Sequence, residues 1–224
     1  SRVVVGSQLR HKAFGMGTVK EMGCIIAISG IDGSGKSTCA DMIKKILEKQ
    51  GLESVILDSM KGGPIVTELM SLCECYHSSP RKMISPMLFN LAWTTDLIYN
   101  YEKNVKSIIE SGKSVILHRS ELCCRVYSKL FDTKNDLIDI ILNRQQITYD
   151  MHFFLDINPQ KAYKRIMGRS PDELTDKECL EKLMEADEIY RNYLKTTSYI
   201  NTNIIKSDIP KDQLENTLRD TIKF

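Results

Sequence analysis

The feature that most constrains the fold of this chain is a glycine-rich loop directly after a short apolar segment. Residues 24–29 read CIIAIS, and residues 30–37 read GIDGSGKS, which satisfies the pattern GxxxxGK[ST]. Apolar residues recur at helical spacing through 37–50, and Gly51 stands where a helix C-terminal cap is expected. A strand, a glycine loop and a helix in this order predict a phosphate-binding loop in an α/β protein.

The residue types in this loop suit the phosphate chain of a nucleotide. Gly30, Gly33 and Gly35 let consecutive backbone N–H groups curl around phosphate oxygens, and the helix N-terminus adds positive partial charge. Lys36 can reach the β- and γ-phosphates, and Ser37 can offer its hydroxyl to Mg²⁺. We therefore expect ATP and Mg²⁺ as cofactors. The other loop residues expected to contact the nucleotide are Asp32, Ser34 and Thr38.

Composition narrows the range of partners and locations. The chain has 31 basic and 29 acidic residues, a net charge of +2, which is typical of a solvated surface rather than a nucleic-acid-binding one. No apolar run approaches the roughly 18 residues of a membrane span, and residues 1–20 lack the apolar region of a secretory signal. We expect a cytoplasmic protein that binds neither nucleic acid nor membrane. The seven cysteines form no CxxC pair, so we expect buried reduced thiols rather than disulfides or a zinc site.

The rest of the chain alternates strands with helices. Further strands are expected at 54–57, 114–117, 151–155 and 203–205. Helical patterns cover much of 65–110, where Pro86 opens a long helix over 87–111, and then 121–130, 136–146, 159–167, 178–195 and 211–222. This alternation predicts an α/β fold with a five-stranded parallel sheet and helices on both faces.

Several classes of phosphate-binding-loop protein are disfavoured. GTPases carry a guanine-reading NKxD run, which this sequence lacks. Motor ATPases and helicases are usually longer. Small kinases fit the length of 224 residues, and they need arginines to neutralise the transferring phosphoryl group. We therefore predict the three-layer P-loop kinase fold.

Residues 1–22 stand outside the alternating pattern. Within them, residues 11–19 (HKAFGMGTV) look like a small β-hairpin module found at the ends of some DNA helicases. We expect residues 1–22 to be an N-terminal extension, either such a hairpin or a segment added by cloning. Residues 23–224 then form the kinase domain, and a polar lid is expected at about 165–176.

The order of motifs resembles the thymidylate kinase family from Ile25 to the C-terminus. The matching segments are SGIDGSGKST at 29–38, GGP at 62–64, LFNLAWTTD at 88–96, SVILHRS at 114–120, FFLDINPQKAYKRIMGR at 153–169 and ADEIYRNYL at 186–194. The resemblance implies Mg²⁺-dependent transfer of a phosphoryl group from ATP to a nucleoside monophosphate, with dTMP to dTDP as the first expectation. Members of this family often form dimers, so a homodimer is also implied.

The resemblance also implies roles for individual residues. Lys36, Ser37 and Thr38 match the phosphate and metal positions, and Asp32 matches the acid that faces the sugar of the acceptor. Arg119 matches the arginine after the third strand that touches the acceptor phosphate. By the same likeness, Lys36 and Arg119 are expected to be catalytic.

Two more arginines match those of the family's lid, Arg165 and Arg169. Position 33 is glycine rather than arginine, so the lid must supply the charge that stabilises the transition state. Because Arg165 and Arg169 are spaced i and i+4, they share one face if the helix persists.

Three side chains of the segment 88–96 are candidates for the acceptor site. Phe89 and Trp93 could stack on the acceptor base, as an aromatic residue does in the family, although helical aromatics more often belong to the core. Asp96 could hold the acceptor or an arginine such as Arg119; the alternative is a solvated acid.

Three positions depart from the family. Ser59 and Leu97 stand where acceptor-binding arginines are expected, and His118 stands where the acid of an Asp-Arg pair is expected. Loss of one arginine at a phosphate removes about 1.5–3 kcal/mol of charge-assisted hydrogen bonding. We expect fewer cations around the acceptor phosphate, and a structural or degenerate role for His118, which brings no negative charge.

These departures leave a second acceptor open. Asp58 ends the second strand, where deoxynucleoside kinases place the carboxylate that takes the proton from the attacking hydroxyl, and HRS at 118–120 is similar to their ERS. The alternative function is therefore a deoxynucleoside or other small-molecule hydroxyl kinase with Asp58 as catalytic base. A third is a nucleotide-binding module without catalysis.

Overall fold

The computed structural model describes residues 23–58, 63–76, 83–131, 136–145, 147–169 and 178–223. These residues contain one five-stranded sheet with the strand order β2-β3-β1-β4-β5, and every neighbouring pair is parallel. The strands are β1 (Ile25–Ser29), β2 (Ser54–Asp58), β3 (Ser114–His118), β4 (Met151–Asp156) and β5 (Asn203–Lys206). All five strands lie where the sequence predicted them, to within one or two residues.

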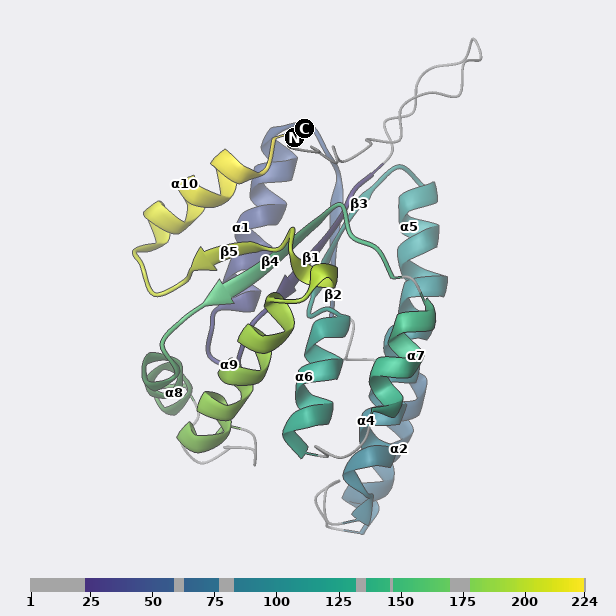
Figure 1. The fold of residues 1–224 in the computed structure, drawn as a ribbon. Coiled ribbons are helices and arrows are strands. Elements are labelled where there is room, and N and C mark those ends of the chain that lie inside the picture. The colour runs from purple at the N-terminus through teal and green to yellow at the C-terminus, as the bar shows by residue number, and fades with distance from the viewer. Residues whose placement is uncertain are drawn as a thin grey trace.

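Helices cover both faces of this sheet (Figure 1). One face carries α1 (Lys36–Lys49) and α10 (Lys211–Thr221). The opposite side of the molecule carries α2 (Pro64–Cys75), α4 (Pro86–Asn100), η1 (Tyr101–Val105), α5 (Lys106–Glu110), α6 (Glu121–Phe131), α7 (Leu137–Gln145) and α9 (Leu180–Leu194). The helix α8 (Pro159–Met167) follows β4, and the short η3 (Thr197–Tyr199) precedes β5. The three-layer α/β fold expected from the sequence is confirmed.

The core consists of two apolar layers separated by the sheet. Along β1, Ile26 and Ile28 pack in the cluster formed with α1 and α10, whereas Ala27 packs in a cluster with η1 and α5. Side chains alternate between faces of a strand, and both faces of a parallel sheet are covered, so β1 is apolar at nearly every position. This burial fixes the ends of β1 and β3, from which the candidate site is built.

The long helix predicted over 87–111 is interrupted. Residues Tyr101–Val105 form a π-helical turn between α4 and α5, in which the Tyr101 hydroxyl donates to the carbonyl oxygen of Thr148 at 3.1 Å. The apolar spacing through this region does not distinguish a π-turn from an α-helix, because α4, η1 and α5 follow one another as one continuous helical segment. Such turns are frequent at functional sites.

Other sequence predictions have mixed outcomes. None of the seven cysteines, all of which lie in described segments, forms a disulfide, but Cys75 and Cys179 are exposed, so the expectation of buried thiols is wrong for these two. Among the described residues, no helix is long and apolar enough to cross a membrane. Residues 1–22, residues 170–176 of the expected lid, and Ser59 lie outside the described residues.

Candidate functional site

The glycine-rich loop joins the end of β1 to the start of α1 and has the backbone geometry of a phosphate cradle. Gly30, Gly33 and Gly35 have φ angles of +148°, +81° and +93°, which disfavour residues with a side chain. A Cβ atom at Gly33 would also lie 2.5 Å from the carbonyl oxygen of Ala162 on α8. The loop therefore requires glycine at position 33, and α8 packs where the family's alternative arginine would project.

Lys36 lies across the inside of the loop. Its ammonium group donates to the carbonyl oxygens of Gly30 at 3.0 Å and Ile31 at 2.8 Å, and it lies 3.5 Å from Oδ1 of Asp32. The Lys36 residue is only 5% exposed. The positive charge is thus held inside the loop, where an incoming phosphate would meet it.

The loop residues fit a nucleotide phosphate chain and Mg²⁺. Ser37 and Thr38 are exposed at the N-terminus of α1. The Ser34 hydroxyl is buried and has no hydrogen-bond partner among the described residues. Within the same residues, no group of three His, Cys, Asp or Glu side chains could hold a metal ion. Mg²⁺ is commonly bound through few protein ligands plus substrate phosphates, so the Ser37 hydroxyl suits it as the protein ligand.

Asp32 links this loop to the end of β3. Nη2 of Arg119 donates to Oδ1 of Asp32 at 2.8 Å, and the Tyr127 hydroxyl donates to Oδ2 at 3.1 Å. Burial opposes the charge of the Arg119 guanidinium, but the Asp32 carboxylate together with Tyr127 and Cys123 outweighs burial and raises the pKa of Arg119 well above its ordinary value. Arg119 has a φ of +98°, the single positive value among the described non-glycine residues. Such backbone strain is typical of functional sites.

A second set of polar contacts joins the C-terminal ends of β2 and β3 to the N-terminus of α1. Asp58 and His118 are direct partners in the β2–β3 register, and Oδ2 of Asp58 lies 3.3 Å from Nδ1 of His118. On the other side of the ring, Nε2 of His118 lies 3.0 Å from Oγ of Ser37. The side chains of His118 and Asp58 are 16% and 22% exposed. The candidate base and the candidate metal ligand are therefore joined through the histidine.

Of the two expected lid arginines, Arg165 lies near the C-terminal end of α8, beside the phosphate-binding loop. The helix ends at Met167, so it does not persist to Arg169, as a shared helical face for the two arginines would require. Nη2 of Arg165 donates to the carbonyl oxygen of Ser207 at 2.9 Å, and Nη1 lies 3.5 Å from the carbonyl oxygen of Gly33. Arg169 is exposed, and its Nε donates to the carbonyl oxygen of Arg165 at 3.4 Å. Arg165 therefore faces the loop already, whereas Arg169 lies at the edge of the described lid residues.

The aromatic candidates for the acceptor site pack against each other. The rings of Phe89 and Trp93 are 5.4 Å apart between centroids and tilted by 40°. Phe89 is 8% exposed and packs in a buried cluster with Cys73 and Ile84. This environment supports the core role for Phe89; Trp93, which is only partly buried, is the more accessible ring.

Asp96 is fully buried, so its interpretation as a solvated acid is wrong. Its two carboxylate oxygens accept hydrogen bonds from the backbone N–H groups of Ile65 at 3.1 Å and Val66 at 2.7 Å, in the first turn of α2. A Cβ atom at Gly63 would lie 2.3 Å from the carboxylate. Asp96 thus holds the N-terminus of α2, while Arg119 pairs with Asp32. The neighbouring Leu97 is 2% exposed and lies in the apolar core.

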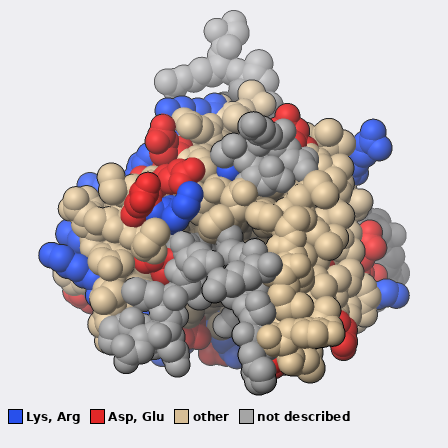
Figure 2. Space-filling model, turned by 90° about the horizontal axis from the view of Figure 1, so that it is seen from below, with Lys and Arg blue, Asp and Glu red and all other residues tan. Residues whose placement is uncertain are grey.

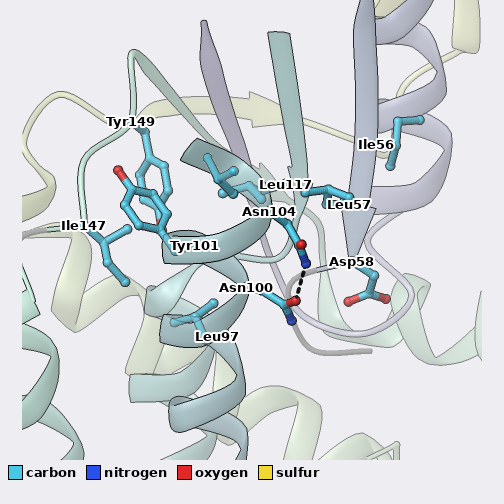
Figure 3. Close-up of a pocket in the computed structure, with 11 residues that line it drawn as sticks. Ile56, Leu57, Asp58, Leu97, Asn100, Tyr101, Asn104, Leu117, Ile147 and Tyr149 are labelled. Atoms are coloured by element: carbon cyan, nitrogen blue, oxygen red, sulfur yellow. Dashed lines mark hydrogen bonds between the residues drawn. The ribbon is translucent and has the colours of Figure 1, made fainter. Parts of the chain in front are cut away.

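Beside Asp58, a cavity of about 210 Å³ opens between β2, β3 and the α4–η1 helix (Figure 3). Its polar lining includes Asn100 and Asn104, and Nδ2 of Asn104 donates to Oδ1 of Asn100 at 2.8 Å. The ring of Tyr101 closes another part of the wall. Asn100, Tyr101 and Asn104 belong to no sequence motif, and Tyr101 and Asn104 lie in the π-turn, so the sequence carries no signal that would mark them.

The site lies at the end of the molecule where the strands terminate, which Figure 2 views from below. On the described residues of this face, acidic and basic side chains are interspersed rather than gathered into a field of one sign. The charges that matter to the site are those of Lys36, Arg119 and Arg165, around the loop.

Comparison with known proteins identifies the family. The sequence model described as Thymidylate_kin, thymidylate kinase, matches residues 28–218. The chain is 29% identical over 163 residues to the thymidylate kinase of Halothermothrix orenii, covering 69% of this chain and 74% of that protein. It is 31% identical over 180 residues to the probable thymidylate kinase of Thermococcus gammatolerans, covering 78% and 83%. The chain therefore belongs to the thymidylate kinase family of P-loop nucleotide kinases.

Proposed function

We propose that this chain transfers the γ-phosphoryl group of ATP to dTMP, with Mg²⁺, and forms dTDP and ADP. Membership of the family supports ATP-dependent transfer to a nucleoside monophosphate. The observation that carries the proposal is the set of three cationic side chains around the loop, Lys36 inside it, Arg119 on Asp32 and Arg165 on the side of Gly33. A reaction between two phosphate groups needs positive charge from several directions.

In this reaction, the backbone N–H groups of the loop and the ammonium group of Lys36 bind and orient the donor phosphates. The Ser37 hydroxyl would hold Mg²⁺, and the ion would supply positive charge against the donor phosphates. Arg119 orients the phosphate of the acceptor from the end of β3, and Asp32 holds the guanidinium in place at 2.8 Å. Arg165 on α8, and Arg169 two residues after it, would approach the transferring group from the side of the loop that faces α8.

One observation favours the second candidate, transfer to a nucleoside hydroxyl. Asp58 ends β2, lines the 210 Å³ cavity and is partly exposed, as a catalytic base would be. Its carboxylate, however, is engaged with Nδ1 of His118 at 3.3 Å. A base that accepts a proton from substrate must point at that substrate, so this engagement weighs against the hydroxyl acceptor.

An acceptor panel tests the proposal. Purified protein with Mg-ATP is offered dTMP, other nucleoside monophosphates, thymidine and other nucleosides, and ADP release is measured against a blank without acceptor. We expect dTMP to stimulate ADP release and thymidine to have no effect. Stimulation by nucleosides alone would support the Asp58-base candidate instead. ATP binding without stimulation by either class would support the noncatalytic module.

We further propose that the protein is a cytoplasmic homodimer that acts on small molecules and not on nucleic acid. Large apolar side chains are exposed along two neighbouring helices, Met70 and Leu72 on α2 and Met87 and Leu88 on α4. Figure 2 shows a broad uncharged area on the side where Figure 1 places these helices. Light scattering that gives a mass near 51 kDa, twice 25.6 kDa, is the expected result.

A further inference from the structure

His118 contacts Asp58 through one ring nitrogen and Ser37 through the other, and the carboxylate limits which nitrogen can carry the proton. The carboxylate of Asp58 only accepts hydrogen bonds at neutral pH, so Nδ1 of His118, 3.3 Å away, must carry a proton. In the neutral ring the second nitrogen, Nε2, is then an acceptor. The group next to Nε2 is the Ser37 hydroxyl at 3.0 Å, and with the ring in this neutral Nδ1–H form the hydroxyl is the hydrogen-bond donor to Nε2.

This hydrogen bond sets the orientation of the Ser37 hydroxyl group. A hydroxyl has one proton and two lone pairs, and here the proton is directed to His118, so the lone pairs face away from the ring. A cation binds the lone pairs and is repelled by the proton. Outer groups of this kind commonly orient the residue that touches a metal.

We propose that His118 is a positioning residue that, held by Asp58, turns the Ser37 hydroxyl so that its oxygen faces Mg²⁺. The family resemblance implies a carboxylate at position 118. In this chain the carboxylate is Asp58 on the adjacent strand β2, and the imidazole of His118 lies between Asp58 and the loop. The inference rests on the proposed function only through the magnesium nucleotide, and it does not depend on the identity of the acceptor.

Two amide variants separate the two ring nitrogens. The amide of asparagine in His118→Asn reaches about as far as Nδ1 and can contact Asp58, whereas that of glutamine in His118→Gln reaches about as far as Nε2 and can accept from Ser37. Glu53→Gln is the matched control, because it removes an exposed carboxylate next to the opposite end of β2, where Glu53 pairs with Lys113 at 2.9 Å.

The first experiment measures the dissociation constant of N-methylanthraniloyl-ADP with Mg²⁺ and with EDTA, in the full chain and without acceptor. We expect Mg²⁺ to tighten binding to the unaltered protein, and His118→Asn to reduce this gain by about 10-fold or more. His118→Gln should retain most of the gain, Glu53→Gln all of it, and binding in EDTA should be similar throughout. An equal gain in His118→Asn and the unaltered protein, or no gain in the unaltered protein, overturns the proposal.

The second experiment determines which ring nitrogen of His118 carries the proton. Nitrogen-15 NMR of the metal-free full chain at about pH 8, with the His118 signals assigned by loss in His118→Gln, distinguishes protonation at Nδ1 from protonation at Nε2. We expect the Nδ1–H form, and a shift toward the Nε2–H form in Asp58→Asn, whose amide can donate to Nδ1. An Nε2–H form in the unaltered protein overturns the proposal. Because dTMP is in neither experiment, failure of the proposed acceptor leaves these results unaffected.

Discussion

Arg119 donates from Nη2 to Oδ1 of Asp32 at 2.8 Å and thereby ties the end of β3 to the phosphate-binding loop. Both side chains are largely buried, at 14% and 8% exposure. The contact restricts the guanidinium before any nucleotide binds, so the cation expected at the acceptor phosphate does not need to be ordered during the reaction.

This pair should be coupled in stability. Arg119→Met leaves the buried Asp32 carboxylate without its guanidinium partner and should lower the free energy of unfolding by about 3 kcal/mol. Adding Asp32→Asn to Arg119→Met should recover part of that loss, since the buried charge is then removed as well. Urea unfolding of the two single variants and the double variant measures the coupling; strictly additive losses would show that the pair does not interact.

Lys36→Ala should abolish phosphoryl transfer and leave the fold intact. The Lys36 ammonium group contacts the backbone carbonyls of Gly30 and Ile31 and the Asp32 carboxylate at the loop, and the donor phosphates depend on its charge. We expect kcat to fall by at least about 100-fold, the scale of removing one preorganised stabilising donor. Circular dichroism controls for folding. A variant that is folded and turns over at the original rate would remove the kinase mechanism.

Gly33→Ala should impair both packing and nucleotide binding. The new Cβ would lie 2.5 Å from the carbonyl oxygen of Ala162, so α8 must move. Gly51→Ala is a matched control, because Gly51 has nearly the same φ, +80° against +81°, and no atom within 4 Å of the added Cβ. Gly51→Ala should cost about 1–2 kcal/mol from backbone conformation alone. Thermal unfolding should show a larger loss for Gly33→Ala; equal losses would contradict the close packing of α8 on the loop.

Buried His152 should make the protein less stable as the pH falls. Its ring lies between the hydroxyl groups of Ser29, 2.8 Å from Nε2, and Thr202, 3.0 Å from Nδ1, and burial lowers the pKa of His152 from 6.5 to about 4. The unfolded chain therefore binds a proton on this residue between pH 6.5 and 4 while the folded chain does not. Stability from His152 is complete above pH 6.5 and is lost as the pH falls toward 4.

Urea unfolding at pH 7 and pH 5 checks this contribution. The free energy of unfolding should fall by about 2 kcal/mol more in the unaltered protein than in His152→Gln, because one pKa unit corresponds to about 1.4 kcal/mol. The comparison of the two proteins cancels the contribution of other titrating groups. The same pH dependence in both proteins would show that His152 is not buried in its neutral form.

The sequence was sufficient to predict the sheet and the loop, because both depend on local patterns. The apolar run of β1 and the glycine spacing after it specify the strand and the cradle without any distant contact. The π-turn at Tyr101–Val105 could not be predicted, since its apolar spacing is that of a helix. The interpretation of Asp96 as a solvated acid failed for a different reason: its partners, Ile65 and Val66, are about 30 residues away and adjacent only after α2 packs on α4.

The site itself was predicted in part. The motif places Lys36 and Ser37 correctly at the loop, and the resemblance directs attention to Arg119. The contact of His118 with both Asp58 and Ser37 depends on strand register and on ring orientation. Neither can be predicted from the spacing of residues in the sequence. Tyr127, which donates to Asp32, lies on a helix whose apolar pattern gives no sign of a polar role.

Transfer of a labelled γ-phosphoryl group to dTMP is the most direct test of the proposed reaction. Purified protein is incubated with Mg²⁺, γ-phosphorus-32 ATP and dTMP, and the nucleotides are separated by chromatography. We expect the label to move to dTDP, with one ADP formed for each dTDP, and Lys36→Ala to give no labelled dTDP. Label that stays in ATP, or is found only in inorganic phosphate, while dTMP is unchanged would contradict the proposed reaction.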